Sequence, residues 1–536
     1  MPAIVTDQFR ILNANNFVES VESDQNSYYV FIGLPNPAGT PETSVRVGYG
    51  RSSDWNATQK TPKPIDSFSN IAHIGDTMMF GKRISSANIR RIIRRIDWSA
   101  GKRYEMYRDD YSTEENKQSP ITSSTRLYNA NYYVMNSEYK VYLCISNGGY
   151  GEPGSNTAKG NISQDEPTFT DLEPSRAGNS GDGYIWKYMY TVSPADILKF
   201  DSTEYITVPN NWSTSDDAQI KAIRENGDST LNNNQIKHVY IEDGGGKYSE
   251  GLGQEVDIVG DGTGGKARVD VVGKVVTDVA VSSGGSGYSY GLVDLGGLQD
   301  ADHPSNQRAK LVPIIPPSLG HGYDIYKELG TDRVLIYARF DDSTKDFPSD
   351  TKFAQVGIVK NPTKVGTVDL YTQPTFSSMS AFIFDTVSAN EPLVGERITQ
   401  VLPDQRIAQG YVASYDKDTK VMKYFRDRSL NFTTPSNDHK DYAGISTTGR
   451  IYDFSASGGS IKGDSSGFSA SINANFSGIT TNPTGTKLID LGITFSGGLS
   501  NTEINKGSGE IVYLDNRPLI ARNERQKEDV KIILEF

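Results

Sequence analysis

The sequence predicts a mainly β protein: a β-rich α+β chain of several β-sandwich domains, with a few helices and inserted β modules. Three observations support this prediction. The 536 residues include 52 glycines, 30 tyrosines and 20 phenylalanines, which favours short strands joined by turns over long helices. Apolar and polar residues alternate in many short runs. A chain of this length also exceeds what one hydrophobic core fills, so several domains are expected.

Residues 1–235 are predicted to form one unit. A helical segment is expected at 9–20, close to the start of the chain. Short apolar runs rich in β-branched and aromatic residues predict strands at 3–6, 28–33, 132–134 and 140–145. We expect the last two of these strands to pair with each other.

Four arginines alternate with isoleucines between residues 89 and 96. Their four-residue spacing predicts one amphipathic helix that ends near Asp97 and Trp98. We interpret the charged side of this helix as a solvated or interface face formed by Arg90, Arg91, Arg94 and Arg95.

The run 181–192 predicts a strand with an aromatic stripe. Its alternation places four large rings on one face: Tyr184, Trp186, Tyr188 and Tyr190. Such a stripe packs in a core more often than it forms a stacking platform for sugar rings, and both interpretations stay open here.

Residues 236–309 are predicted to be an inserted β module. Two glycine-tyrosine units, 243–248 and 283–288, place their tyrosines 40 residues apart. This spacing predicts an approximate β repeat, with strands at 256–259, 267–272 and 279–281. The glycine-rich stretch 260–265 is followed by a strand where a phosphate-binding loop needs a helix N-terminus, so nucleotide binding is not predicted.

Residues 310–369 are predicted to continue the first unit, with strands at 333–340 and 353–362. Both runs are dominated by β-branched and other apolar residues.

Residues 370–505 are predicted to form a second inserted β domain. Its clearest signature is a hairpin with strands at 410–415 and 421–428, joined by a turn rich in aspartate. The stretch 455–500 is rich in Gly, Ser, Thr and Asn, which predicts an exposed linker or a loosely ordered β region.

Residues 506–536 are predicted to complete the first unit with two strands. Ile511, Val512 and Tyr513 suit a half-buried pleated surface, and turn-forming residues follow at Asp515, Asn516, Arg517 and Pro518. The run 530–536 alternates as a strand does, so a terminal hairpin is expected. Because chain ends usually fray, the apolar Phe536 predicts a docked terminus.

Charge and cysteine content exclude several classes of protein. A formal net charge of −12 argues against a surface that grips nucleic-acid phosphates, and no window approaches the apolar length of a membrane span. One cysteine, Cys144, rules out an intrachain disulfide and suits a reducing compartment. It lies between apolar neighbours, so we expect a buried, unreactive thiol.

No catalytic or metal-binding constellation is evident, so we predict a non-enzymatic protein without a cofactor or required metal. The histidines are too far apart to form a local ligand set: His73, His238, His303, His321 and His439. His321, flanked by glycines, is the best single candidate for a ligand site, although a turn histidine bonded to local backbone is the favoured interpretation. No nucleophile elbow is present, and the carboxylates of Asp109 and Asp110 point to opposite sides if they lie in a strand.

Several segments, in the same order along the chain, resemble the gene-product-eight family of baseplate wedge proteins from T4-like contractile-tailed phages. The most specific of them is the C-terminal motif 508–518 with the closing strand 530–536. The others are 3–10, 94–98, 181–192 and 353–362. The resemblance covers roughly 1–235, 310–365 and 505–536, whereas 236–309 and 370–505 depart from the family pattern.

This resemblance implies a structural subunit of a virion tail baseplate, assembled in the host cytoplasm. It also implies a homodimer that contacts other wedge subunits, and it leaves fibre-connecting proteins as further partners. The residues expected to determine the interface or the fold are Tyr513, Asn516, Arg517, Pro518, Tyr184, Trp186, Tyr188, Arg94, Arg95 and Trp98. The alternative is a tail-fibre or spike-type glycan-binding protein, possibly glycan-cleaving, which the aromatic stripe and the β repeat would support.

Overall fold

The computed structural model describes most of the 536 residues. The described ranges are 6–33, 68–112, 117–299, 303–341, 352–393, 396–426, 452–483, 485, 488–521 and 526–536. The expected strand at 3–6 lies largely outside them. The chain divides into two compact units: unit 1 holds 1–18, 90–335 and 533–536, and unit 2 holds 19–89 and 336–532.

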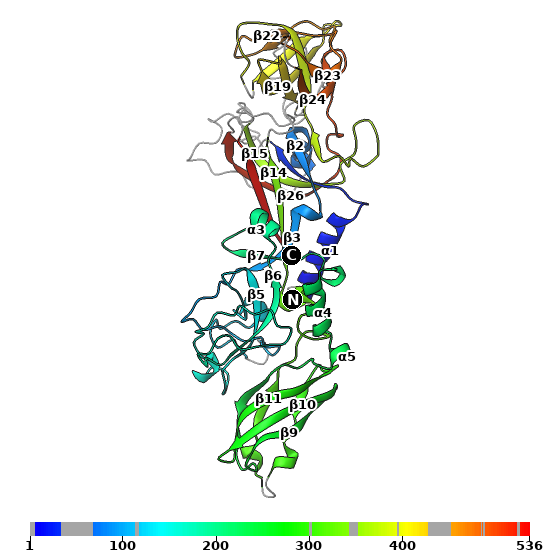
Figure 1. The fold of residues 1–536 in the computed structure, drawn as a ribbon. Helices are drawn as coiled ribbons and strands as arrows, with labels where there is room; N and C mark the ends of the chain where they lie inside the picture. The colour runs from blue at the N-terminus through cyan, green and yellow to red at the C-terminus, as the bar shows by residue number, and fades with distance from the viewer. Residues whose placement is uncertain are drawn as a thin grey trace. The chain divides into compact units, whose positions relative to one another are not determined.

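The helices are few and short, and strands dominate the described chain (Figure 1). The helices are α1 (Asp7–Glu22), α2 (Phe68–Thr77), α3 (Pro194–Phe200), α4 (Ala218–Gly227), α5 (Ser229–Asn232) and α6 (Ile325–Leu329). This confirms the predicted mainly β class. Among the described residues, no helix has both the length and the apolar character that crossing a membrane requires.

Helix α1 confirms the helix expected at 9–20. The Thr6 hydroxyl accepts a hydrogen bond from the Phe9 amide at 3.3 Å, which satisfies one of the free donors of the first turn. Ile11, Ala14 and Val18 are buried, and their spacing of three and four residues defines the packed face of the helix.

Unit 1 contains a three-stranded sheet in the order β4-β5-β6, built from β4 (Tyr133–Met135), β5 (Lys140–Asn147) and β6 (Tyr184–Thr191). The first two strands pair antiparallel as expected. Strand β6 pairs with β5 through two irregularities in register, and its side chains are buried on both faces. The largest hydrophobic cluster described in unit 1 surrounds this sheet.

A second sheet has the order β27-β14-β3-β7 and corrects the predicted arginine helix. Its strands are β27 (Glu528–Glu535), β14 (Arg333–Phe340), β3 (Ile89–Arg94) and β7 (Tyr205–Val208). Residues 89–94 are therefore a strand, because the isoleucines are β-branched and Ile89, Ile92 and Ile93 are buried against neighbouring strands. The four-residue spacing suggested a helix only as long as the partner strands were unknown.

The predicted module at 236–309 contains one antiparallel sheet in the order β11-β10-β9-β12, whose three long strands lie side by side in Figure 1. The strands are β9 (Gly251–Gly260), β10 (Thr263–Val272), β11 (Val275–Ser286) and β12 (Gly291–Val293). A separate pair, β8 (Val239–Asp243) and β13 (Lys310–Pro313), lies beside it in the sequence. All three strands expected in this module are present.

Unit 2 contains a five-stranded sheet in the order β16-β2-β1-β15-β26. Its strands are β16 (Thr375–Ser377), β2 (Met78–Ile84), β1 (Tyr28–Gly33), β15 (Lys352–Lys360) and β26 (Glu510–Ala521). Strand β1 matches the predicted range 28–33, and all six of its residues are buried.

The expected terminal hairpin is wrong. Strand β26 continues through Asp515, Asn516 and Arg517, the residues read as a turn, and pairs with β15, whereas β27 pairs with β14 in the other sheet. The turn-forming residues are accommodated by a shift in register between Phe353 and Gln355. Pro518 is tolerated because β26 lies at the edge of its sheet.

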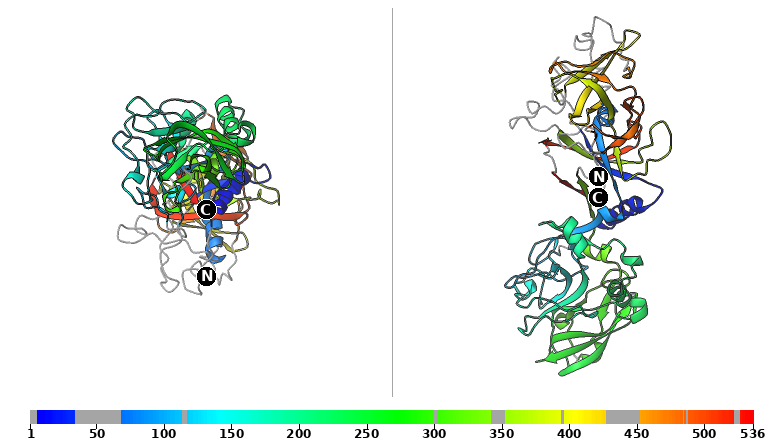
Figure 2. Two further views of the ribbon diagram at one scale, coloured as in Figure 1. Left: turned by 90° about the horizontal axis from the view of Figure 1, so that it is seen from below. Right: turned by 45° about the horizontal axis from the view of Figure 1, so that its top comes forward.

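The remainder of unit 2 forms a closed barrel. Six strands pair in a ring: β17 (Ser380–Val387), β20 (Val421–Phe425), β19 (Ile407–Asp416), β18 (Arg397–Val401), β21 (Ile461–Gly463) and β22 (Ser469–Ile472). Pairing of β17 with both β20 and β22 closes it. The predicted hairpin corresponds to β19 and β20, and Figure 2 shows these yellow strands side by side.

The glycine- and serine-rich stretch 455–500 is a β region and not a linker. It supplies two barrel strands, the hairpin β23 (Gly478–Thr481) and β24 (Ile489–Phe495), and the short β25 (Leu499–Ser500). Phe468 and Ala470 from this stretch are buried in the barrel core. Small polar residues here lie mostly at turns, while the few apolar residues point inward.

Candidate interface residues

The three expected ring anchors of the aromatic stripe are buried. Tyr184, Trp186 and Tyr188 have at most 1% of their surface exposed. The Tyr184 and Trp186 rings stack with centroids 5.3 Å apart, and Tyr104 packs edge-on against both. The stripe therefore packs in the core of unit 1 and offers no ring face to a sugar or a partner.

Arg94, Arg95 and Trp98 make contacts within unit 1. The Arg94 guanidinium donates to the carbonyls of Tyr128 and Ala130, at 3.2 and 2.8 Å. Arg95 pairs with Asp97 and Asp201, at 3.0 and 3.1 Å. Trp98 is partly buried, and its indole N–H donates to the Ser163 hydroxyl at 3.1 Å.

Arg95 also borders a small pocket beside α3. The cavity measures about 20 Å³ and is lined mainly by apolar side chains that include Tyr139, Ile197, Phe200 and Ile206. This volume holds about one water molecule, so the site does not suit an organic ligand.

The residues expected at a terminal turn lie in edge strand β26 instead. Asn516 is buried, and its side-chain oxygen accepts a hydrogen bond from the Gln355 amide at 2.9 Å. Arg517 is exposed and pairs with Asp515 at 2.6 Å, and Tyr513 is half-buried. These residues fix the strand within unit 2, and Arg517 remains accessible to solvent.

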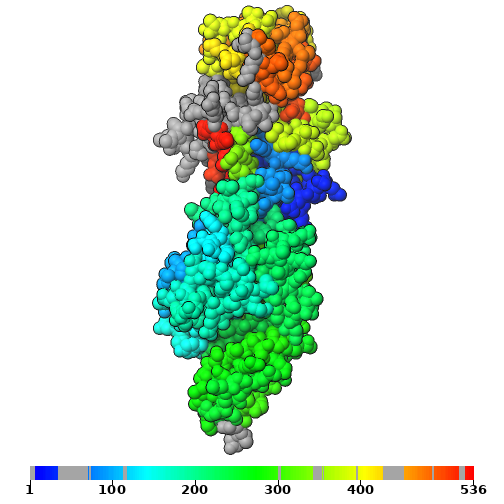
Figure 3. Space-filling model, in the orientation of Figure 1, coloured from blue at the N-terminus to red at the C-terminus, as the bar shows by residue number. Residues whose placement is uncertain are grey.

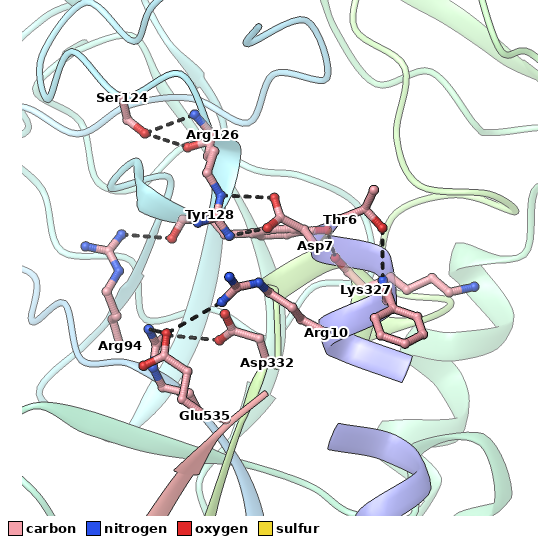
Figure 4. Close-up of polar contacts among 12 residues, drawn as sticks. Thr6, Asp7, Arg10, Arg94, Ser124, Arg126, Tyr128, Lys327, Asp332 and Glu535 are labelled. Atoms are coloured by element: carbon pink, nitrogen blue, oxygen red, sulfur yellow. Dashed lines mark hydrogen bonds and ion pairs between the residues drawn. The ribbon is translucent and has the colours of Figure 1, made fainter. Parts of the chain in front are cut away.

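A polar cluster that the sequence did not reveal joins both ends of the chain within unit 1 (Figure 4). Arg126 pairs with Asp7 on α1, and Arg333 pairs with Glu535 on β27 at 2.9 Å. Arg10 lies 3.8 Å from the same Glu535 carboxylate. We call these residues, with Asp332, the terminal cluster: Asp7, Arg10, Arg126, Asp332, Arg333 and Glu535.

The chain end itself is docked beside this cluster, as Phe536 predicted. The Phe536 amide donates to the Asp332 carbonyl at 3.1 Å, and its ring lies 5.5 Å from that of Phe17. Burial raises the pKa of the Asp332 carboxyl, although the neighbouring Arg333 opposes the shift. The cluster members are more than 100 residues apart in several cases, so no local sequence pattern could have identified them.

A cavity of about 30 Å³ opens within the terminal cluster. Arg94, Arg126 and Arg333 line it together with Asp332 and Glu535. Its volume suits one or two water molecules bridging these polar groups.

The titratable groups of the core are also structural. The His321 ring nitrogen Nδ1 lies 2.5 Å from the Glu328 carboxylate, and both side chains are buried. The interpretation of His321 as a turn histidine bonded to backbone is therefore wrong, since its partner is a side chain. Burial raises the pKa of the Cys144 thiol, as expected for an unreactive cysteine in a strand.

Comparison with known proteins gives one informative similarity. No family model matches the chain. Over 228 residues, the chain is 23% identical to the baseplate wedge protein gp8 of Enterobacteria phage T4. The match covers 39% of this chain and 60% of that protein. The similarity is weak, and it points to a structural role in a phage baseplate. Among the described residues, no group of three or more His, Cys, Asp or Glu side chains could hold a metal ion.

Proposed function

We propose that this chain is a wedge subunit of a contractile phage tail baseplate. It binds neighbouring wedge proteins and takes part in baseplate assembly and in the rearrangement that follows host attachment. The observation that carries the proposal is the similarity to the T4 baseplate wedge protein, which extends over 228 residues. The mainly β, multi-sheet architecture suits a protein that works through broad surfaces and not through a pocket.

The proposal includes a non-enzymatic role. The charged side chains of the core, such as Lys187, His321 and Glu328, are almost completely buried and have no route to a substrate. The two cavities described above hold about 20 and 30 Å³, room for water but not for a sugar. The glycan-binding alternative also loses its main support, because the aromatic stripe is buried.

The proposal further includes a homodimer and contacts with other wedge subunits. Exposed side chains on edge strands are the best anchors that the structure offers for such contacts, and Arg517 on β26 is one of them. The wedge assignment and the dimer are separate claims, so they need separate tests.

Cross-linking mass spectrometry on purified tail particles tests the wedge assignment. The informative lysines are Lys247, Lys266, Lys506 and Lys531, and we expect cross-links from them to other baseplate subunits. Lys187 provides an internal control because its buried amine is out of reach of a reagent. Cross-links confined to fibre proteins, or a chain absent from the particle, would contradict the proposal.

Light scattering on the purified chain tests the dimer. A mass of twice 58.8 kDa is the expected result. A trimer would favour a fibre or spike protein, and a monomer at micromolar concentration would remove the homodimer from the proposal while leaving the wedge assignment to the cross-linking result.

A further inference from the structure

The sheet β11-β10-β9-β12 has one face on a core and one face in solvent. Its inward residues form a hydrophobic cluster that includes Ile258, Ala267, Val269, Val271 and Val276. Because successive side chains in a strand point to opposite faces, the alternate residues lie on the outer face. In Figure 3 this part of unit 1 is the bright green region.

Two aliphatic pairs stand exposed at opposite ends of the outer face. Val259 is the cross-strand partner of Leu292, and Val272 is the partner of Val275. These four side chains are between 38% and 62% exposed, although each lies within or at the end of a strand. Exposed apolar residues that recur in register on one sheet face are typical of a binding surface.

The middle of the outer face is charged and unbalanced. Lys266 pairs with Glu255 at 2.9 Å and lies 4.0 Å from Asp257, and Arg268 is the cross-strand partner of Glu255. With Asp270 and Asp278, the face carries four carboxylates and two cations.

Asp270 and Asp278 are direct cross-strand partners on β10 and β11. Like charges directly opposite each other destabilise a sheet. Asp270 accepts a hydrogen bond from the Gly253 amide at 2.6 Å, but no ion pair joins either carboxylate to a lysine or arginine in the part of the chain that the structure describes. This pair lies next to Val272 along β10, so an unbalanced negative charge adjoins an exposed aliphatic pair.

We propose that the outer face of this sheet is a docking surface for another protein that presents lysine or arginine side chains among aliphatic ones. The partner's cation would lie between Asp270 and Asp278, and its aliphatic side chains would cover Val272 and Val275. A second copy of the same face is a poorer occupant, because two faces with excess negative charge repel each other. The inference stands without the proposed wedge function, since it rests on the sheet alone.

Fluorescence anisotropy tests this surface with the full-length chain and a defined probe. The probe is a fluorescein-labelled peptide of alternating lysine and valine, roughly nine residues long to match an ordinary strand. A peptide of alternating glutamate and valine serves as the charge-reversed control. We expect saturable binding of the lysine peptide and none of the glutamate peptide.

Two variants locate the binding. Val272→Glu places a charge in the exposed aliphatic pair, and we expect it to weaken binding by roughly tenfold or more. The double variant Asp270→Asn with Asp278→Asn should weaken binding to a similar degree and raise the melting temperature, because it removes the like-charge repulsion. Leu198→Glu on α3 is the matched control, an exposed leucine elsewhere in unit 1 whose substitution should leave binding unchanged.

The proposal fails if both variants bind the lysine peptide as tightly as the unmodified chain does, because attraction would then reflect only the overall charge of −12. It also fails if sedimentation velocity shows that Val272→Glu abolishes self-association, which would make a second copy the occupant. The double asparagine variant decides the outcome if Val272→Glu does not fold.

Discussion

Lys187 is a charged residue placed in the core of unit 1. It is fully buried on β6, and its ammonium donates to the Leu172 carbonyl at 2.8 Å. Burial lowers the pKa of Lys187 from 10.5 to about 8, and the charge of Lys237 adds to the shift. The Leu172 carbonyl also accepts from the Asn226 amide at 3.0 Å, so it keeps a partner if the lysine is replaced.

Lys187→Met should make unit 1 more stable at pH 7 and less dependent on pH. Because the folded pKa lies below the unfolded value, the cost of burying the charge is fully present below pH 8 and is relieved as the pH rises from 8 towards 10.5. A shift of this size corresponds to roughly 3 kcal/mol. We therefore expect a gain of about 1–3 kcal/mol for the variant at pH 7. The measurement is urea unfolding at pH 7, 8 and 9.

The control for this prediction is Lys221→Met, which replaces a half-exposed lysine on α4. It should leave both the stability and its pH dependence nearly unchanged. An unfolding free energy of Lys187→Met that rises between pH 8 and 9 as steeply as that of the unmodified chain would show that another group titrates there.

Burial also explains why the residue predictions divided as they did. Tyr184, Trp186 and Tyr188 were identified correctly as one aromatic run, but alternation alone does not say whether both faces of the strand are covered. Strand β6 pairs with β5 and lies inside a large cluster, and these contacts come from segments far away in the sequence. The same distance hid the terminal cluster, whose ion pairs join residues near both ends of the chain.

At the scale of elements, the barrel in unit 2 depends on a buried carboxylate. Glu396 is fully buried just before β18. It accepts hydrogen bonds from the amides of Leu393, Ser465 and Ser466 at 2.9 to 3.0 Å, and from the Ser466 hydroxyl at 2.6 Å. It thereby ties β18 to the turn between β21 and β22, two segments about 70 residues apart in the sequence.

Glu396→Gln should destabilise the barrel by about 1–3 kcal/mol, because the new amide group faces backbone N–H donors that it cannot accept from. Thermal unfolding followed by circular dichroism measures the effect. Glu391→Gln is the matched control, since Glu391 makes an exposed ion pair with Lys417 that contributes little. Equal stability of the two variants would mean that the turn does not depend on the carboxylate.

Local sequence patterns predicted those strands whose partners did not have to be known. Strands β1, β5, β14 and the β19–β20 hairpin follow from alternation and turn residues. Strand β3 was predicted as a helix because its isoleucine spacing fits both periods, and only pairing with β7 decides between them. The terminal hairpin failed for a related reason: β15, more than 150 residues away, is a better partner for β26 than the neighbouring strand.

At the scale of the whole molecule, the two units are interleaved in the sequence. The chain passes from one unit to the other after residues 18, 89, 335 and 532. The predicted module 236–309 lies wholly in unit 1 and the predicted domain 370–505 wholly in unit 2. Sequence composition marked these two blocks, whereas the interleaving of the other segments depends on strand pairing that no local pattern encodes.

Deleting residues 509–536 should abolish soluble folding or dimerisation. The deletion removes β26 from the five-stranded sheet and β27 from the four-stranded sheet, and it leaves β15 and β14 each without a partner strand. Expression, solubility and light scattering measure the outcome. A truncated chain that stays folded and dimeric would contradict the expectation.

The pairing of the last strand with unit 1 bears on when this protein can fold during its synthesis. Unit 1 holds both residues 1–18 and residues 533–536, and Arg10 and Phe17 of α1 contact Glu535 and Phe536 directly. A ribosome releases these last residues from its exit tunnel only after translation of residues 1–536 is finished, so α1 waits for its partner throughout that time. Neither unit is completed on the ribosome, and closing a loop of more than 500 residues makes the last step slow. Nascent chains of this protein should therefore depend on chaperones that shield unpaired strand edges until β27 is in place.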